Sequence, residues 1–323
     1  MTTIALAVLV GAAAGNVLAQ ESIEPEPAVM ARLAPKALAL DATTADGALI
    51  AVGERGHILM STDGGSTWVQ KPSPTRAMLT AVCFADRQHG WAVGHDSAIL
   101  RTLDGGESWE LVNWAPEEEA PFFDVWFSDL DHGFALGAYG SFFVTSDGGE
   151  TWVFEPISDD DLHLDNMAQA PDGRLYIAAE AGGAFRSDDG GATWSPLPSP
   201  YEGSFFGVLP LPDDVVLLYG LRGHVFRSED AGETWQPVET GTVAMITDGI
   251  RLADGRIVLV GLGGSVLVST DDGRTLSLHQ QPDRRGISAV VQTDDGRLLL
   301  AGEFGVKVAS LDELTGEADS AER

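Results

Sequence analysis

Six aspartates recur along this chain at a nearly constant interval, and regularly spaced carboxylates are candidates for chemistry. They are Asp63, Asp104, Asp147, Asp189, Asp230 and Asp271. Each is followed by Gly-Gly or a close variant of it, and consecutive copies lie 41 to 43 residues apart. In such a turn the carboxylate accepts backbone N–H bonds while glycine adopts a positive φ. We therefore predict that these aspartates shape turns and take no part in catalysis.

A second set of candidates combines arginines with a tyrosine and two acids. They are Arg55, Arg222, Arg284, Arg285, Tyr139, Glu180 and Asp96. A sialidase would use an arginine triad for the substrate carboxylate, a tyrosine paired with a glutamate as nucleophile, and an aspartate as acid. A sialidase-like glycoside hydrolase is therefore the alternative hypothesis, but an arginine near the start of the sialidase consensus is missing.

Other catalytic and ligand-binding patterns are missing from the sequence. It contains no Gly-x-Ser-x-Gly elbow, no phosphate-binding loop and no histidine pair spaced for zinc, and its seven histidines are scattered singly. The run Asp159–Asp161 offers oxygen ligands for calcium but lacks EF-hand spacing, so we interpret it as a solvated loop. We predict no catalytic residue, no metal and no cofactor.

The composition limits the class of partner. The formal net charge of −30 comes from 49 acidic and 19 basic residues. Nucleic acid and anionic membrane surfaces would be repelled by this charge. The single cysteine, Cys83, excludes a disulfide framework within the chain.

The segment Ser61–Trp68 is the clearest copy of a unit that is repeated through the chain. It recurs at 102–109, 145–152, 187–194 and 228–235, and without its tryptophan at 269–276. Glycines precede most copies at the same interval: Gly53, Gly94, Gly137, Gly220, Gly261 and Gly302. The apolar runs between them are too short for a helical stripe, so each unit predicts four short antiparallel strands. Seven units predict an all-β, seven-bladed β-propeller.

The tryptophans that end these copies are predicted to cover the turn and the gap to a neighbouring sheet. They are Trp68, Trp109, Trp152, Trp194 and Trp235. The repeated phrase resembles the Asp-box of sialidases, which also occurs in many proteins that are not enzymes and in which the aspartate is structural. Known sialidases have six blades, whereas this chain has seven units.

The chain ends differ from the repeats. Residues 1–19 are predicted to be a signal peptide cleaved near Ala19, which places the mature chain in the periplasm or otherwise outside the cytoplasm. No Lys or Arg precedes the apolar run, so an uncleaved anchor is the alternative. In residues 20–36, the segment Ala28–Ala34 is predicted to pair with a strand near Val306–Ser310 and close the ring. The propeller spans 37–310, and 311–323 is predicted to be a flexible tail.

Propeller topology places the glycine hinges and the links between units on one rim and the Asp-turns on the other. The hinge rim varies from unit to unit, which is typical of the binding surface of a repeat protein. Its candidate binding residues are Arg55, Arg76, His95, Trp114, Tyr139, Glu180, Tyr201, Arg222, Arg284 and Arg285. We expect Trp114 and Tyr201 to be exposed aromatic contacts.

Units such as Gly90–Gly94 followed by Thr102–Trp109 resemble the photosystem II stability and assembly factor family, over roughly residues 25 to 310. The resemblance implies a seven-bladed, non-catalytic, chaperone-like scaffold that holds a membrane-protein intermediate through an arginine-rich patch. Similar proteins in heterotrophic bacteria are associated with exporters of the resistance-nodulation-division (RND) type. This chain differs in being very acidic and short of arginine. We predict a monomeric scaffold that binds a membrane-protein complex or its periplasmic domain without inserting into the membrane.

Overall fold

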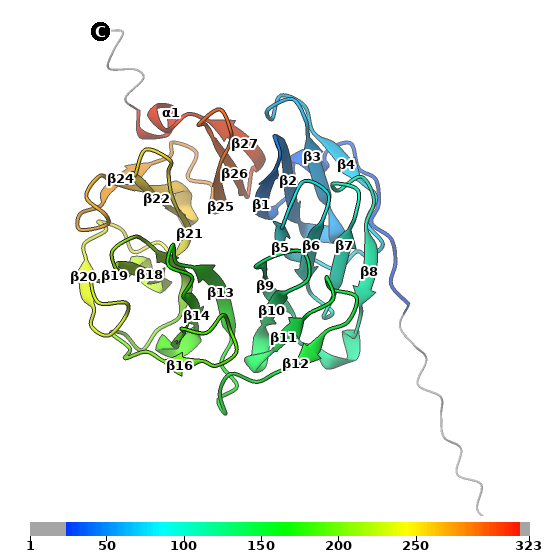
Figure 1. Cartoon of the computed structure of the whole chain (residues 1–323). Coiled ribbons are helices and arrows are strands. Elements are labelled where there is room, and N and C mark those ends of the chain that lie inside the picture. Colours follow the sequence, from blue (N-terminus) through cyan, green and yellow to red (C-terminus); the bar gives the residue numbers. More distant parts are fainter. Residues whose placement is uncertain (1–23, 317–323) are drawn as a thin grey trace, which may run out of the picture.

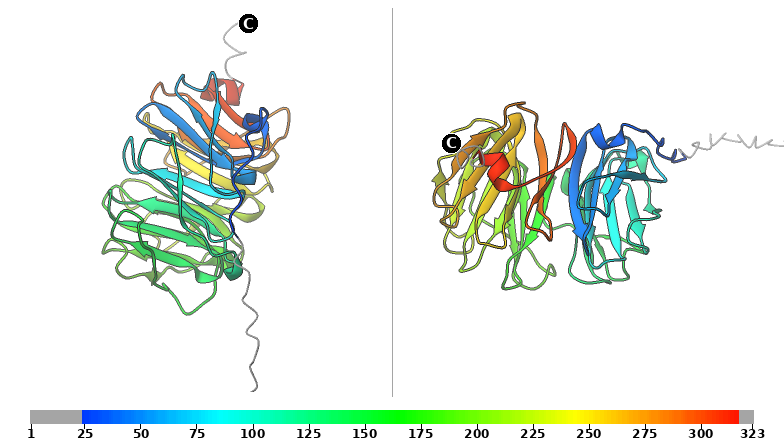
Figure 2. Two further views of the ribbon diagram at one scale, coloured as in Figure 1. Left: turned by 90° about the vertical axis from the view of Figure 1, so that its right-hand side faces the viewer. Right: turned by 90° about the horizontal axis from the view of Figure 1, so that it is seen from above.

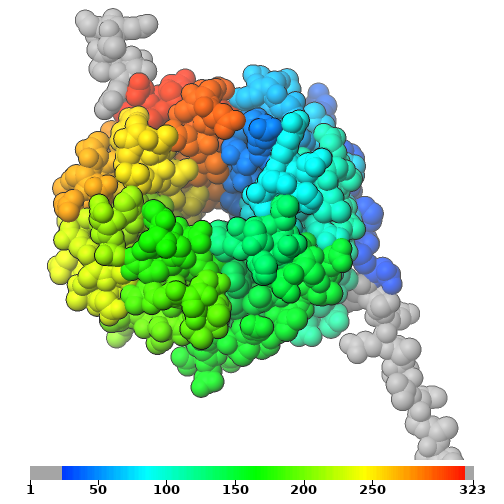
Figure 3. Space-filling view, viewed as in Figure 1, coloured from blue at the N-terminus to red at the C-terminus, as the bar shows by residue number. Residues whose placement is uncertain are grey.

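The computed structural model describes residues 24–316, and within them short apolar runs form strands wherever turn residues separate them. Each sheet is a meander of consecutive strands, and seven sheets stand around a central axis (Figure 1). The view of Figure 3 shows a narrow opening where the seven meet. The predicted seven-bladed, all-β propeller is confirmed.

The strands follow the chain in blade order. Blades 1 to 4 contain β1 (Ala39–Ala45), β2 (Ala48–Gly53), β3 (Ile58–Ser61), β4 (Val69–Lys71), β5 (Leu79–Phe84), β6 (Gly90–Gly94), β7 (Ile99–Thr102), β8 (Glu110–Asn113), β9 (Phe122–Phe127), β10 (Gly133–Gly137), β11 (Phe142–Thr145), β12 (Val153–Phe154), β13 (Leu164–Gln169), β14 (Leu175–Ala179), β15 (Ala184–Ser187) and β16 (Ser195–Pro196). Blades 5 to 7 contain β17 (Phe205–Pro210), β18 (Val216–Gly220), β19 (Val225–Ser228), β20 (Gln236–Val238), β21 (Ile246–Arg251), β22 (Ile257–Gly261), β23 (Ser265–Ser269), β24 (Ser277–Gln280), β25 (Ile287–Gln292), β26 (Leu298–Gly302) and β27 (Gly305–Ala309).

The helical segments are short. The 3₁₀ turns are η1 (Ala34–Lys36), η2 (Glu54–Gly56), η3 (Pro116–Glu118), η4 (Ala138–Gly140), η5 (Glu180–Gly182), η6 (Leu221–Gly223) and η7 (Leu262–Gly264), and α1 (Leu311–Thr315) is an α-helix. Most of the 3₁₀ turns join the second strand of a blade to its third. The side views show the turns of all blades gathered on two opposite rims (Figure 2).

Apolar clusters between neighbouring blades hold the ring together. Trp109 of blade 2 packs into the cluster shared with blade 1, and Trp152 of blade 3 packs into the cluster shared with blade 2. Leu276 takes this place in blade 6, where the repeat lacks its tryptophan. Each Asp-turn thus carries a side chain that covers the boundary with the preceding blade.

Inner strands are also joined by half-buried aspartate side chains. Asp41 Oδ2 accepts a bond from the backbone N–H of Val82 at 2.7 Å, and Asp248 Oδ2 accepts one from Val290 at 2.8 Å. Asp124 Oδ2 accepts the bond from Met167 at 2.8 Å. Burial raises the pKa of Asp124 to about 6 and the pKa of Asp248 to about 7, because desolvation disfavours the carboxylate.

The predicted closing strand is wrong. Among the described residues, the seventh sheet has the three strands β25, β26 and β27, and no N-terminal strand joins it. The segment Ala28–Ala34 lies against blade 1 instead. There the Gln70 side chain accepts a bond from the Ala31 N–H at 2.7 Å and donates one to the Val29 carbonyl at 3.0 Å. Blades 1 and 7 meet through an apolar cluster that includes Leu49, Leu299 and Ala301, so packing closes the ring.

The predicted flexible tail is also wrong at its start. Residues Leu311–Thr315 form α1, which begins with a capping box between Ser310 and Glu313. Leu311 and Leu314 are buried in the cluster between blades 6 and 7, where other blades place the Asp-turn tryptophan. The predicted signal peptide and the rest of the predicted tail lie outside the described residues.

Candidate functional site

The Asp-turns use their aspartates for local bonds. Asp147 Oδ1 accepts bonds from Thr145 Oγ1 at 2.8 Å and from the Thr151 N–H at 2.9 Å, and Oδ2 accepts one from Thr151 Oγ1 at 2.6 Å. The hydrogen bonds from Thr151, followed by the one from Thr145, lower the pKa of Asp147 to about 2. The same pattern occurs at Asp63, Asp104, Asp189, Asp230 and Asp271. Both carboxylate oxygens are therefore engaged in the turn.

The opposite rim is formed by the turn after each second strand, which we call the hinge rim. In every blade a backbone N–H of this turn bonds to the carbonyl just before the first strand, as Ala138 does to Pro121 at 2.9 Å and Leu221 to Ser204 at 3.0 Å. The links between blades pass over the same turns, because a Cβ on Gly182 would lie 2.1 Å from the Tyr201 carbonyl oxygen. Hinge turns and blade links therefore share one rim, as the topology predicts.

Several hinge turns display a large side chain from a left-handed backbone position. Arg55, Tyr139 and Arg222 occupy equivalent places in blades 1, 3 and 5, with φ of 58°, 56° and 58°. Non-glycine residues seldom adopt this conformation, so its repeated use is a feature of the fold. The side chain of Tyr139 is 61% exposed. The hinge rim thus carries cationic or aromatic groups at this position in blades 1, 3 and 5.

Blades 3 and 4 bring four of their side chains together on the hinge rim around His163. The ring of Tyr139 lies 5.1 Å from the His163 ring, and the ring of Phe123 lies 5.6 Å from it, centroid to centroid. Glu180 Oε1 accepts a bond from the His163 N–H at 2.9 Å. We call Phe123, Tyr139, His163 and Glu180 the His163 cluster. It presents the exposed ring of Tyr139, with Phe123, His163 and Glu180 half-buried beside it.

Asp165 stands next to this cluster on β13. Burial, and then the charge of Glu180, raise the pKa of Asp165 to about 8. Its Oδ2 is buried and has no hydrogen-bond partner among the described residues. At the equivalent position of blades 2 and 6, Thr80 and Thr247 donate to the carbonyl that begins the next blade, each at 2.7 Å. A protonated Asp165 has the same donor character, so this acid fits the repeat in its neutral form.

The arginines of the sialidase hypothesis belong to different parts of the ring. Arg55 lies on blade 1 and Arg222 on blade 5, whereas Arg284 and Arg285 lie in the link between blades 6 and 7. Arg285 donates to the Glu303 carbonyl and stands 5.9 Å over the Phe304 ring. The structure does bring Tyr139 and Glu180 together at His163, but these arginines come from elements outside blades 3 and 4.

Other predicted rim residues are engaged locally. Arg76 Nη1 lies 2.6 Å from the Glu26 carboxylate, and the backbone N–H of His95 donates to the Met78 carbonyl. The expected exposure of Trp114 and Tyr201 is wrong, because both are half-buried. Trp114 packs on the cluster between blades 1 and 2, and the Tyr201 ring lies 4.4 Å from His224. Tyr139 is the rim aromatic that solvent reaches most readily among these three.

Sequence reasoning missed Phe123, His163 and Asp165. Phe123 and Asp165 occupy the second position of an inner strand, where the paired register shifts in every blade. Comparing this position across the seven units would have singled out Asp165, because the other blades carry Leu40, Thr80, Phe123, Phe206, Thr247 and Ser288 there, none of which is ionisable.

Within residues 24–316, no set of three or more His, Cys, Asp or Glu side chains is arranged to hold a metal ion. This includes the run Asp159–Asp161. The same part of the chain has no helix with the length and apolar character needed to cross a membrane.

The ring of meanders and the repeated Asp-turn together define an Asp-box β-propeller. The family model described as photosynthesis system II assembly factor YCF48 matches residues 73–122 and 113–318, so the chain belongs to this family.

Known relatives match the sequence over short stretches. The photosystem II stability/assembly factor HCF136 of Cyanidioschyzon merolae is 41% identical over 85 residues, which cover 26% of this chain and 18% of that protein. The photosystem II assembly protein Ycf48 of Thermosynechococcus vestitus is 42% identical over 43 residues, or 13% of this chain and 12% of that protein.

Solved structures match over most of the ring. A structure of YCF48 bound to a D1 peptide has a TM-score of 0.71 at 19% identity and covers 87% of this chain and 94% of its own. Streptogramin B lyase has a TM-score of 0.72 at 14% identity, covering 85% and 95%. At these identities both comparisons show the shared fold.

Proposed function

We propose that this chain is a non-catalytic scaffold that binds a protein through its hinge rim and acts as an assembly or accessory factor for a membrane-protein complex. Its relatives are assembly factors, and a family structure carries a D1 peptide. We further propose that the chain works after export to the periplasm and that, in a non-photosynthetic host, its partner is an exporter of the RND type.

The His163 cluster, with its exposed Tyr139 ring, is the observation that carries the hinge-rim proposal. Tyr139 offers a large, mostly exposed ring that contacts the His163 ring edge-to-face at 5.1 Å, so little side-chain freedom is lost when a partner covers it. Glu180 adds a carboxylate beside the rings, which suits a partner segment that carries a basic side chain. On the Asp-turn rim, by contrast, the aspartate oxygens accept hydrogen bonds from their own turns.

Two positions on the same blade test which rim binds. A photo-crosslinking amino acid at Tyr139 reports on the hinge rim, and one at Leu130, which is 45% exposed in the β9–β10 turn, reports on the opposite rim. In cells of the host, we expect crosslinks to a defined membrane protein from position 139 and none from position 130. Equal labelling from both positions, or labelling from position 130 alone, would refute the hinge-rim proposal.

The contact of Tyr139 and Glu180 with His163 is the observation that favours the alternative, a sialidase-like hydrolase. Hydrolysis of a fluorogenic sialoside by the full chain distinguishes the hydrolase from the scaffold. We expect no turnover above that of the Tyr139→Phe and Glu180→Gln variants. Turnover that both substitutions abolish would establish the enzyme.

A further inference from the structure

Blade 7 lacks the outer strand that every other blade has. Six sheets contain four strands, and β27 pairs with β26 and with no other strand of the described chain. The chain then turns into α1, whose leucines anchor it against blade 6. One edge of β27 is therefore left without a neighbouring strand, and such an edge is a template for another strand.

The N-terminal segment covers one end of this edge. A Cβ on Gly305 would lie 2.1 Å from the Pro35 carbonyl oxygen, so η1 closes off the start of β27. Upstream of η1, Ala28 N–H donates to the Ser73 carbonyl at 3.0 Å, and Gln70 holds the segment against blade 1. Further along β27, Lys307 is exposed.

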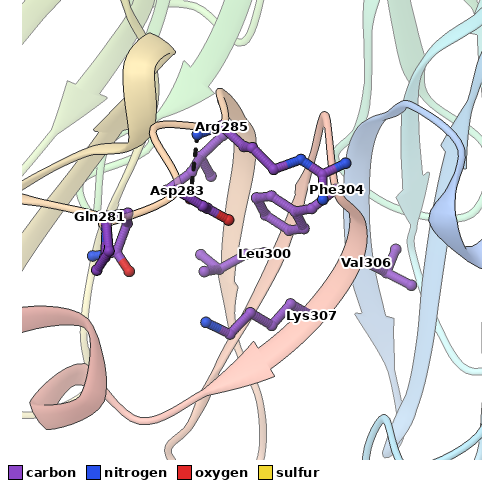
Figure 4. Close-up of a pocket in the computed structure, with 9 residues that line it drawn as sticks. Gln281, Asp283, Arg285, Leu300, Phe304, Val306 and Lys307 are labelled. Carbon is purple, nitrogen blue, oxygen red and sulfur yellow. Dashed lines mark hydrogen bonds between the residues drawn. The ribbon is translucent and has the colours of Figure 1, made fainter.

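A hollow of about 450 Å³ lies beside β27, where the missing strand would place its side chains (Figure 4). Ile287 and Leu300 are almost fully buried at its base, and Phe304 lines it. Arg285 and Lys307 bring positive charge to it, and Asp283, in the link from blade 6, brings one carboxylate. Figure 4 shows Leu300 between Phe304 and Lys307. The hollow therefore combines an apolar base with a border of two cations, Arg285 and Lys307, and one acid, Asp283.

Lys307 departs from the repeat. It pairs with Leu300 of β26. In the other six blades, the third-strand residue at this position is apolar and pairs with a residue of the outer, fourth strand. Those pairs are Leu59 with Gln70, Leu100 with Leu111, Phe143 with Phe154, Phe185 with Pro196, Phe226 with Pro237 and Leu267 with Leu278. The only other lysines of the chain are Lys36 and Lys71.

A lysine on an edge strand discourages pairing with an apolar strand. The same ammonium group stabilises a strand that carries a carboxylate directly opposite it. The side chain opposite Lys307 would point to the same face as Lys307, over the hollow, and residues two positions away would also face it. The edge therefore discriminates between strands by charge.

We propose that β27 accepts an extended segment of a partner protein as the fourth strand of blade 7, with an Asp or Glu opposite Lys307 and an apolar residue two positions away over Leu300 and Phe304. Main-chain bonds along β27 hold the segment, and Lys307 sets its register and its charge preference. This site goes beyond the hinge-rim function, because Lys307 is separate from the His163 cluster.

The outer strand of blade 6 supplies a probe. The acetylated and amidated peptide Thr-Leu-Ser-Glu-His-Gln-Gln copies residues 275–281 with Leu278→Glu, which puts the glutamate in the place opposite Lys307. Its parent with leucine is the matched control. In titrations against the full chain, we expect the glutamate peptide to bind two- to fivefold tighter than the parent, as for a cross-strand charge pair. Hydrogen exchange should slow in β27.

Substitutions on the protein complete the test. Lys307→Glu should weaken binding of the glutamate peptide about tenfold, and Lys307→Leu should reverse the preference in favour of the parent. Lys71→Glu on the outer strand of blade 1 is the control and should change neither affinity. Circular dichroism and tryptophan fluorescence check that each variant folds.

Four results would overturn the proposal. The first is equal affinity of both peptides for all Lys307 variants, and the second is slowed exchange at the hinge turns with none in β27. The third is a dimer that Lys307→Glu dissociates, which would make a second copy of the chain the occupant. The fourth is a crosslink from β27 to residues 1–23 of the same chain. Lys307 variants leave the His163 cluster intact, so failure here is distinguishable from failure of the hinge-rim function.

Discussion

Replacing Asp248 by Asn should remove a large part of the pH dependence of stability. Asp248 is half-buried on the inner strand β21, and its carboxylate oxygens accept the N–H groups of Gly249 at 2.7 Å and of Val290, in blade 7, at 2.8 Å. Burial raises its pKa to about 7. Between the ordinary pKa of an aspartate and this value, the folded chain keeps a proton that the unfolded chain has lost. Stability is therefore greatest at low pH and falls as the pH rises toward 7.

The magnitude follows from the displacement of the pKa. A folded-state pKa that is higher by about 3 units lowers the free energy of unfolding by about 4 kcal/mol once the pH exceeds that pKa, at about 1.4 kcal/mol per unit. Between pH 5 and pH 8, Asp248 accounts for a fall of about 2–3 kcal/mol in the free energy of unfolding. Asparagine does not ionise, and Asn166 already plays this part in blade 4, where its Oδ1 accepts the Val208 N–H at 3.1 Å. Asp248→Asn should thus flatten the pH profile.

Urea unfolding followed by tryptophan fluorescence from pH 5 to pH 8 measures this effect. The exposed Asp294→Asn removes the same charge and controls for the general relief of repulsion in a chain of net charge −30. We expect the free energy of unfolding of the wild type and of Asp294→Asn to fall over this range, and that of Asp248→Asn to fall by about 2–3 kcal/mol less. Equal slopes for all three proteins would refute the burial argument.

Three further substitutions test other parts of the fold. Trp152→Ala should lower the free energy of unfolding by about 2–4 kcal/mol, because the half-buried indole packs edge-on against Phe127, with ring centroids 5.9 Å apart. An unchanged melting temperature would contradict this packing. Leu314→Ala, at a side chain that is 3% exposed, should cost about 2–3 kcal/mol, whereas a flexible tail would tolerate it without loss. Asp165→Thr restores the hydroxyl of the repeat and should stabilise the chain by about 2–3 kcal/mol more at pH 9 than at pH 6. Urea unfolding at the two pH values checks this, and an equal effect at both would show that Asp165 does not titrate in this range.

The fold could be predicted from the sequence because every unit carries the same turn and strand signals. Asp-Gly-Gly places a turn, and the short apolar runs admit strands and exclude helices. The chain ends carried no such pattern. Ala28–Ala34 has apolar residues suited to a closing strand, but the amide side chain of Gln70 forms two bonds with this segment and holds it on blade 1.

The hinge rim could be located from topology, whereas the arrangement of its side chains could not. Burial of Trp114 and Tyr201 depends on contacts between residues far apart in sequence, as in the Tyr201–His224 pair. The His163 cluster likewise joins Phe123, Tyr139 and His163 from three segments. A single sequence does not reveal such contacts, although position-by-position comparison of the seven units points to Asp165.

Charge reversal on the two rims, with binding of the crosslinked partner as the readout, tests the central claim most directly. Arg55→Glu with Arg222→Glu changes the hinge rim, and Arg87→Glu with Arg274→Glu makes the same charge change on the Asp-turn rim. There, Arg87 forms an exposed ion pair with Asp46, and Arg274 forms one with Glu229 and donates a bond to the Asp271 carbonyl at 3.3 Å. Quantitative mass spectrometry after crosslinking in host envelopes should show about a tenfold loss of partner for the hinge-rim variant and less than about a twofold loss for the other. Equal losses, or a greater loss from the Asp-turn rim, would contradict recognition by the hinge rim.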